Sequence, residues 1–377
     1  MGTSNQGELI PVAEPVFIGN EKTYVADCID STWISSSGKY IRLFEESFAE
    51  FCGVEHAVSC SNGTVALHVA LLGLGVEPGD EVIIPTLTYV ATANAVTYCG
   101  ATPVLVDSEP VTWNMDPMLI ESLVTSRTKG IIVVHLFGHP VDMDPIMAIA
   151  EKYGLFVLED AAEAHGAEYK GRRAGSIGHA ATFSFYGNKI ITTGEGGMVV
   201  TNDDGLAARM RQLKGQGMQP GSRYWFPIVG YNYRMTNIEA AIGLAQLEQI
   251  DWHLARRREN AQWYAEFLGD CELVCLQPEM PWAKNVYWIN SVVLGESVRL
   301  TRDEVMDALA AKSIETRPFF YPMHVLPIYE HLTGPEGYPV ADMLSSRGIN
   351  LPSSAKLTRE DVARVSSALI YLVKAMR

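Results

Sequence analysis

The fold is decided first by the stretch HAVSCSNGTVALHVALLGLG (56–75), which changes from one structural pattern to another at a single turn. HAVSC (56–60) is a short apolar run typical of a buried strand, and TVALHVALLGLG (64–75) is typical of a helix. The turn between them contains Gly63. Because a strand that leads directly into a helix is half of the unit that builds parallel sheets, we predict an α/β domain.

The same alternation continues to residue 202, with a second helical pattern at DPIMAIAEKYG (144–154). Helices between strands predict a mostly parallel sheet that is covered on both faces. The last two predicted strands are too close in sequence for a helical crossover, so we expect an antiparallel edge in a mixed sheet of about seven strands. The further strands are predicted at EVIIP (81–85), TPVLVD (102–107), GIIVVHLFG (130–138), LFVLEDA (155–161), AATFSFYG (180–187) and GGMVVTN (196–202).

The composition changes beyond a long helical pattern that ends at about Leu268. One long helix is predicted from Asn237 to about Leu268, with the RRR run (256–258) on a solvated face. A strand at 287–295 and helices at 301–312 and 357–376, with Thr301 and Thr358 as N-caps, follow. We therefore predict a large domain over 1–250 and a smaller C-terminal α+β domain over 251–377, bridged by the long helix.

Charge and composition exclude several classes of partner. The chain has 377 residues and a formal net charge of −15. A surface that follows phosphates or anionic lipids needs clustered Lys and Arg, so we expect neither nucleic acid nor a membrane as partner. No apolar run approaches the roughly 20 residues that span a bilayer, and the start of the sequence does not resemble a signal peptide, so we expect a cytoplasmic protein. The six cysteines are not at metal spacing, and we expect no metal.

Three features of the large domain carry candidate chemistry. Gly63 and Thr64 would place free N–H groups and a hydroxyl at a helix N-terminus, which suits a phosphate, although such turns are often only tight turns. Asp160 ends an apolar strand, where open α/β sheets bind ligands, although it could simply cap the next segment. Lys189 follows another strand near Ser184 and is either a surface charge or an amine tuned by its neighbours.

Together these features specify pyridoxal 5'-phosphate (PLP). This cofactor needs a phosphate cradle, an anion beside its pyridine nitrogen and an amine that condenses with its aldehyde. Gly63, Thr64 and Ser184 would form the cradle, Asp160 would supply the anion and Lys189 the amine.

The sequence also resembles the DegT/DnrJ/EryC1/StrS family of nucleotide-sugar aminotransferases. The resemblance covers nearly the whole chain and implies the aspartate-aminotransferase type I fold. It rests on several motifs in the family's order, namely GTVAL (63–67), EVIIPTLTYVATANAV (81–96), VLEDAAEAHGA (157–167), SFYGNKIITTGEGG (184–197), GYNYRMTNIEAAIGLAQL (230–247) and RPFFYPMH (317–324).

The resemblance implies roles for individual residues. Lys189 would bond to the cofactor and then move the proton between carbon atoms, while Asp160 would pair with the pyridine nitrogen. Position 163, often Gln in the family, would hydrogen-bond the ring 3-hydroxyl, and here it is Glu163. Tyr89 would stack on the cofactor ring. Asn232 resembles a residue that reaches the phosphate from a partner subunit, which implies a homodimer with shared active sites, although it could be only a turn residue.

Lys189 also decides which reaction is expected. A branch of the family that removes a sugar hydroxyl has His at this position, so Lys189 favours a transaminase over a dehydratase. The motifs SFYGNK (184–189) and RPFFYPMHVLPIY (317–329) favour GDP-4-keto-6-deoxymannose as acceptor and L-glutamate as donor, over a UDP- or dTDP-linked 3- or 4-keto sugar. Five residues are candidates for binding the substrate, although each could equally have only a structural role. They are Trp33, Arg234, Arg317, Tyr321 and His324.

The sequence disfavours two other functional classes of protein. A PLP-fold sensor fused to a DNA-binding module would need a helix-turn-helix appendage, and the net charge opposes DNA. A dehydrogenase would need a GxGxxG motif after a strand, and no such motif is found. Both classes are therefore disfavoured.

Overall fold

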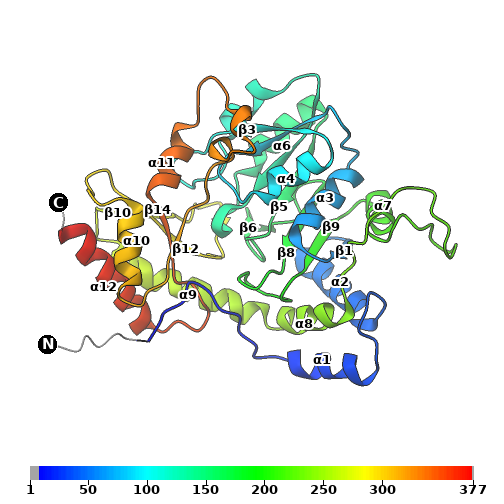
Figure 1. Ribbon diagram of the computed structural model, residues 1–377, viewed down its shortest axis with the longest axis horizontal. Coiled ribbons are helices and arrows are strands. Elements are labelled where there is room, and N and C mark those ends of the chain that lie inside the picture. The colour runs from blue at the N-terminus through cyan, green and yellow to red at the C-terminus, as the bar shows by residue number, and fades with distance from the viewer. Residues whose placement is uncertain (1–7, 376–377) are drawn as a thin grey trace.

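The computed structural model describes residues 8–375, and a seven-stranded sheet forms its centre (Figure 1). The strands β2, β3, β4, β5 and β8 run parallel, and β9 pairs antiparallel with both β8 and β1. The mixed sheet is therefore confirmed, but the antiparallel strand lies one place inside the edge, which β1 forms. In sheet order the strands are β1 (His56–Cys60), β9 (Gly197–Thr201), β8 (Ala180–Ser184), β5 (Phe156–Asp160), β4 (Thr128–Val134), β2 (Glu81–Pro85) and β3 (Thr102–Val106).

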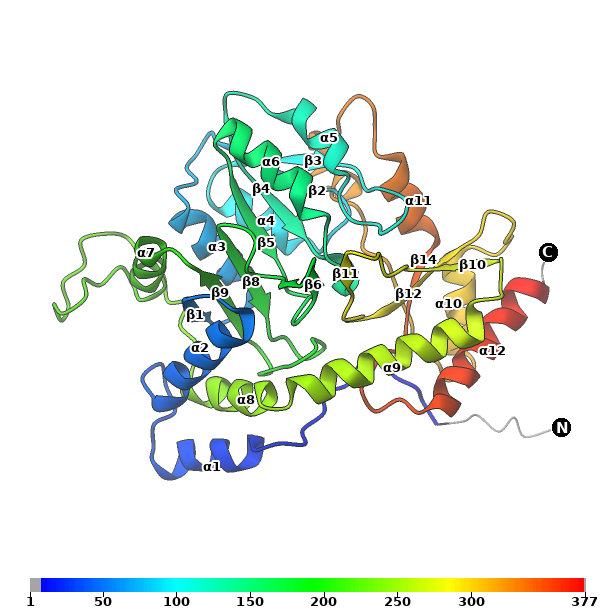
Figure 2. The same cartoon turned by 180° about the vertical axis from the view of Figure 1, so that it is seen from behind.

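Both faces of this sheet are covered by helices. Successive strand residues face opposite sides, and Ile83 accordingly lies in a different apolar cluster from Val82 and Ile84. Figures 1 and 2 show α3 and α4 on one face and α6 on the other. The helices of this part are α1 (Glu21–Asp30), α2 (Lys39–Cys52), α3 (Gly63–Gly73), α4 (Ala91–Tyr98), α5 (Pro117–Ile120), α6 (Met143–Tyr153) and α7 (Asp204–Lys214).

The predicted long helix is instead two helices, α8 (Asn237–Leu247) and α9 (Ile250–Leu268). Gln249 leaves the helical conformation at φ −110° and ψ 14°. The break has a tertiary cause, because the Glu248 carboxylate accepts hydrogen bonds from Tyr24 at 2.7 Å and Asn20 at 2.8 Å. Neither Gly nor Pro marks this break, so the sequence pattern did not reveal it.

A second sheet lies in the C-terminal part, with strand order β10-β12-β14-β13 and antiparallel pairing throughout. Its core includes Tyr264, Val292, Leu309 and Val365 from the sheet and its helices, and also Ile10 from the start of the chain. The division at residue 250 stays a prediction. The elements are β10 (Val274–Leu276), β12 (Asn290–Leu294), β13 (Arg317–Pro318), β14 (Gly348–Leu351), α10 (Arg302–Ala310), α11 (Pro339–Arg347) and α12 (Arg359–Ala375).

The predicted caps of this part are confirmed. Thr301 accepts a hydrogen bond from the Glu304 N–H, and Glu304 in turn accepts from Thr301, which completes a capping box. Thr358 and Asp361 exchange equivalent bonds at the start of α12. The last residue of the predicted helix, Met376, lies outside the described residues.

The remaining elements are short. A three-stranded sheet joins β11 (Ala283–Lys284), β6 (Glu168–Tyr169) and β7 (Arg172–Arg173). Short 3-10 helices are η1 (Glu121–Leu123), η2 (Leu136–Gly138), η3 (Met323–Val325) and η4 (Glu330–Leu332). Within residues 8–375, no helix combines the length and apolar character that crossing a membrane requires.

Candidate active site

A cavity of about 700 Å³ opens at the carboxyl ends of the parallel strands. One wall comes from the start of α3 and the ends of β5 and β8, and the facing wall from β13, β14 and the segment before β12. Among its lining residues are Gly63, Thr64, Tyr89, Asp160, Glu163, Ser184, Lys189, Trp288, Arg317, Phe320 and Asn350. Seven of the eight predicted catalytic and cofactor-binding residues therefore lie together in this cavity. The cavity is at the edge of the sheet where α/β proteins bind ligands.

The start of α3 forms a cradle for an anion. The Asn62 side chain caps the helix by accepting from the Val65 N–H at 3.0 Å, while other N–H groups of the first turn have no acceptor within the helix. A Cβ on Gly63 would lie 2.8 Å from the Ser184 Cβ. Only glycine therefore lets the helix approach β8 this closely, and this brings the Ser184 hydroxyl beside the helix N-terminus.

Asp160 is a buried carboxylate at the end of β5. It accepts hydrogen bonds from the Thr92 hydroxyl at 2.8 Å and the Ala162 N–H at 3.2 Å. Burial raises the pKa of Asp160, and these two donors together with the Lys189 charge oppose that rise. A carboxylate in this setting gains from a cationic N–H on the cavity side, which a protonated pyridine supplies.

Lys189 extends into the same cavity from the loop after β8. Its Nζ lies 3.8 Å from the Glu163 Oε1 and 3.9 Å from the centre of the Trp288 ring. Burial lowers the pKa of Lys189, while the carboxylates of Glu163 and Asp160 act in the opposite direction. The amine thus reaches its neutral, nucleophilic form more readily than an exposed lysine does.

Glu163 is held by an unusual turn of the backbone. The strand predicted over 130–138 ends at Val134, and Phe137 adopts the left-handed region with φ 58°. The turn aims the Phe137 N–H at the Glu163 Oε2, 2.7 Å away. Burial raises the pKa of Glu163 to about 7 even though Lys189 and the Phe137 N–H lower it. Glu163 is therefore a proton acceptor or donor near neutral pH.

The lining residues fit PLP. The cradle that a Cβ at Gly63 would fill suits the phosphate, the buried Asp160 suits the ring nitrogen, and the buried Lys189 suits the aldehyde. When bound, this cofactor supplies an electron sink for carbon atoms that lose a proton. The roles of the individual residues stay predictions.

Two of the other predicted residues also line the cavity. Tyr89 is exposed at its rim, with its ring centre 5.8 Å from that of Phe320. Arg317 lies on β13, and its guanidinium is 3.6 Å from Glu315.

The remaining five predicted residues do not line the cavity in this chain. Asn232 and Arg234 are exposed and hydrogen-bond each other, Trp33 is exposed, and Tyr321 contacts Arg302. Both ring nitrogens of His324 are occupied, by Thr86 at 2.8 Å and Asp342 at 2.9 Å. The contacts of His324 are those of a structural residue.

Some residues of the site were missed by the sequence prediction. Thr92 is one helical turn beyond Tyr89 and holds Asp160, a relation that spacing along α4 could have suggested. Trp288, Phe320 and Asn350 come from the C-terminal part, and no local pattern links them to Lys189. The arginine run was also misjudged, because Arg257 is buried rather than solvated.

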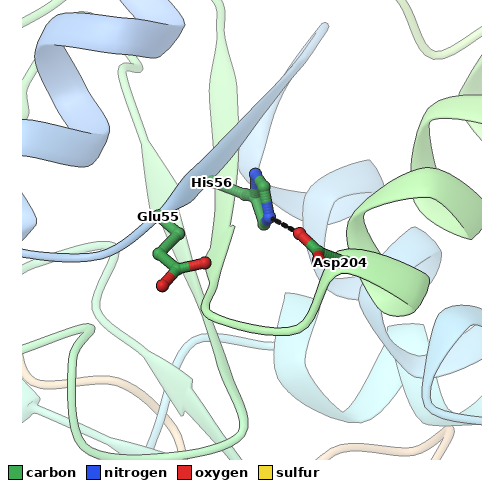
Figure 3. A group of neighbouring side chains, drawn as sticks. All are labelled: Glu55, His56 and Asp204. Carbon is green, nitrogen blue, oxygen red and sulfur yellow. Dashed lines mark hydrogen bonds and ion pairs between the residues drawn. The ribbon is translucent and has the colours of Figure 1, made fainter.

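A separate polar group, Glu55, His56 and Asp204, lies at the start of β1 and α7. Figure 3 shows an interaction only between His56 and Asp204, whose Nε2 and Oδ1 are 2.6 Å apart. The Asp204 side chain is 89% exposed. The pair joins β1 to the first turn of α7, and nothing about it indicates a ligand.

Comparison with known proteins identifies the group to which the chain belongs. A family model described as the DegT/DnrJ/EryC1/StrS aminotransferase family matches residues 17–370. A GDP-perosamine synthase of Caulobacter vibrioides is 55% identical over 361 residues, which cover 96% of this chain and 97% of that protein. A GDP-perosamine synthase of Escherichia coli O157:H7 is 51% identical over 360 residues, with coverage of 96% and 97%.

A solved structure shows the same fold with a reaction intermediate. The crystal structure of S. venezuelae DesV in complex with a ketimine intermediate superposes with a TM-score of 0.89 at 36% identity, covering 94% of each chain. The expected aspartate-aminotransferase type I fold and the PLP dependence are thereby confirmed. With its lysine, buried carboxylate and phosphate cradle in one cavity, the chain belongs to the DegT/DnrJ/EryC1/StrS family of PLP-dependent aminotransferases.

Proposed function

We propose that the chain transfers the amino group of L-glutamate to the 4-keto carbon of GDP-4-keto-6-deoxymannose and so forms GDP-perosamine. The observation that carries the proposal is that two GDP-perosamine synthases share at least half of their residues with this chain over nearly its full length. Glutamate leaves as 2-oxoglutarate, so the donor gains a keto group where it loses its amino group, and the acceptor gains the amino group where it loses its keto group.

The residues of the cavity suit this exchange. Lys189 Nζ takes the proton from the α-carbon of the donor and returns it to the sugar carbon, which requires an amine that is buried and readily neutral. Asp160 holds the proton of the ring nitrogen, and Thr92 keeps that carboxylate in place. Glu163 faces Lys189 at 3.8 Å and accepts or donates a proton near neutral pH.

The acidic chain must bind an anionic substrate through local groups. The net charge is −15, yet the start of α3 presents backbone N–H groups and β13 presents Arg317 to the same cavity. We propose that these groups bind the cofactor phosphate and either the sugar diphosphate or the donor carboxylate.

A comparison of acceptors tests the substrate. With glutamate as donor, kcat/KM for GDP-4-keto-6-deoxymannose should exceed that for UDP- and dTDP-linked 4-keto sugars by about 100-fold, because the lost contacts leave buried polar groups unpaired. The rate of each reaction is measured as release of 2-oxoglutarate, with a coupled dehydrogenase. Faster turnover of a dTDP-linked sugar would overturn the GDP assignment and leave the aminotransferase assignment intact.

We also propose a homodimer whose active sites are shared between subunits. The segment after α7 projects from the body of the molecule (Figures 1 and 2) and exposes Tyr224, Trp225, Phe226 and Val229. Exposed apolar side chains in one segment are typical of an interaction surface. Asn232 follows this segment, is exposed and does not line the cavity of its own chain, as expected of a residue that serves the partner's site.

Mixing two inactive variants tests the shared site. When Lys189→Ala and Asn232→Ala chains exchange subunits at random, half of the dimers are mixed and one of their two sites is intact, so activity should recover to about a quarter of the wild-type value. Each variant mixed with itself is the control. Activity no higher than the mean of the two controls would show that Asn232 does not cross the interface.

The setting of the enzyme is part of the same proposal. We propose a cytoplasmic enzyme whose product enters O-antigen and lipopolysaccharide biosynthesis, as the GDP-perosamine assignment suggests. We retain the division into a PLP-binding part over 1–250 and a C-terminal part over 251–377, because the C-terminal part contains its own four-stranded antiparallel sheet.

A further inference from the structure

Arg257 is a buried cation that the chemistry described so far does not use. It lies in the middle of α9, only 4% exposed, and it does not line the cavity. Within residues 8–375 it forms no ion pair with a carboxylate, and its Nε has no hydrogen-bond partner. Its neighbours in the arginine run are more exposed, and Arg258 pairs with Glu279.

The guanidinium donates to three backbone carbonyls from three separate segments. One Nη reaches the Lys189 carbonyl at 3.3 Å, and the other reaches the carbonyls of Trp288 and Ser353, the latter at 3.2 Å. These segments are the loop that carries Lys189, the residues before β12 and the residues after β14. Arg257 therefore joins the backbone of the lysine loop to the C-terminal part of the molecule.

Trp288 holds the same loop from a second side. Its indole N–H donates to the Asn188 carbonyl at 2.8 Å, and its ring lies 3.9 Å from the Lys189 Nζ. The carbonyl of Trp288 is itself bound by Arg257. The backbone of residues 188–189 is thus fixed by two side chains, which limits where the Lys189 amine can lie.

Burial of an unpaired cation lowers the stability of the folded protein. A buried arginine without a carboxylate partner therefore suggests that its charge serves the chemistry of the site. Burial lowers the pKa of Arg257 to about 10. Burial is the main cause of the lowered pKa of Lys189, and the charge of Arg257 adds a smaller effect in the same direction. The same charge lowers the pKa of the buried His165 imidazole, which lies at about 3 chiefly because of burial. On the cavity side of Lys189, Glu163 and Asp160 act in the opposite direction. A neutral side chain at position 257 could bind the carbonyls but could not oppose these two carboxylates.

We propose that Arg257 is a positioning residue for the amine of Lys189: it fixes the backbone of the lysine loop through the Lys189 carbonyl and places a buried, unpaired positive charge beside that loop. The role extends the family assignment and is independent of which sugar nucleotide is the acceptor.

The rate at which PLP recombines with the apo-protein separates the two parts of this role. The rate, followed as growth of the visible band, depends on pH through the neutral fraction of Lys189 and reaches a plateau at high pH set by geometry. Arg257→Gln keeps a donor but removes the charge, so the midpoint should move up by about 0.5–1.5 pH units, which slows the reaction at neutral pH about 3- to 30-fold. Arg257→Lys keeps the charge but loses the planar guanidinium that donates to three carbonyls. The midpoint pH of the rate should therefore stay unchanged, while the plateau rate falls about 10-fold.

Arg258→Gln is the matched control, because it removes an arginine from the next position of α9 that binds Glu279 and the Asn285 carbonyl instead. It should leave both midpoint and plateau at wild-type values. An unchanged midpoint in Arg257→Gln, or an equal shift in Arg258→Gln, overturns the electrostatic part. If Arg257→Gln does not fold, Arg257→Lys decides alone, since an unchanged plateau there overturns the positioning part. The assay contains no sugar nucleotide, so failure of the acceptor assignment would not affect it.

Discussion

Replacement of Lys189 by alanine is expected to lower amino transfer by at least about 10⁴-fold and to remove the visible absorption of the PLP-loaded protein. Lys189 is the amine that reaches the cavity between Glu163 and Trp288, at 3.8 Å and 3.9 Å, and no second lysine from residues 8–375 lines that cavity. If Lys189 has the roles proposed for it, the substitution removes both the bond to the cofactor and the group that moves the proton. Steady-state release of 2-oxoglutarate and an absorption spectrum measure the two effects.

Lys214→Ala provides the control for loss of a buried lysine. Its side chain is as little exposed as that of Lys189, 12% in each case, and it pairs with Glu45 at 3.1 Å away from the cavity. This variant should lose stability but keep the visible band and most of its specific activity. If instead Lys189→Ala retained colour and activity, the assignment of the amine would be wrong.

Glu163→Gln is expected to change the pH dependence of stability of the apo-protein. The pKa of Glu163 is about 7 in the folded chain, against an ordinary value of 4.5. Between these values the unfolded chain has already released the proton that the folded chain retains, so Glu163 lowers the free energy of unfolding as pH rises from 4.5 to 7. The total change is roughly 3 kcal/mol and stays constant at higher pH. Urea unfolding of both proteins from pH 4.5 to 8 gives the difference directly.

Glu45→Gln supplies a control of the opposite sign. Burial alone would raise the pKa of Glu45, but the charge of Lys214 and hydrogen bonds from Ser59 outweigh it and lower that pKa. Its contribution to stability is therefore complete above the ordinary carboxyl range and is lost only as pH falls below it. The difference between wild type and Glu45→Gln should be flat from pH 5 to 8. Parallel curves for wild type and Glu163→Gln over that range would contradict the raised pKa of Glu163.

The sheet and the convergence of seven predicted residues on one cavity could be predicted because their signals are local. Each buried parallel strand is a short apolar run, and Gly63, Asp160 and Lys189 each follow such a run. The carboxyl ends of parallel strands meet at one edge, so residues distant in sequence converge there. The predicted strand at 130–138 failed only beyond Val134, where Phe137 turns to bind Glu163.

What the sequence did not reveal depends on contacts between distant segments. The break at Gln249 is fixed by Glu248 bonding Asn20 and Tyr24, which precede it by more than 200 residues. Arg257 looks like one of three solvated arginines, and only the carbonyls around it distinguish it from its neighbours. Whether an arginine is buried depends on the segments that pack against it, and the sequence around Arg257 does not show which segments these are.

The substrate residues were the least predictable part of the site. The motif that contains His324 suggested a substrate contact. In the structure its two ring nitrogens instead form hydrogen bonds with Thr86 and Asp342. Asn232, Arg234 and Trp33 lie outside the cavity of their own chain, and the role proposed for Asn232 requires a second subunit. A sequence gives no direct signal for a site completed by symmetry.

The central claim is that Lys189 is the amine that bonds to PLP, and chemical trapping tests it most directly. Borohydride reduction of the PLP-loaded protein fixes the cofactor to the nitrogen to which it is bound, and mass spectrometry of the digested protein then locates the modified lysine. One pyridoxyl group for each chain is expected, on the peptide that contains Lys189. A pyridoxyl group on any other lysine, or none after reduction of a coloured protein, would contradict it.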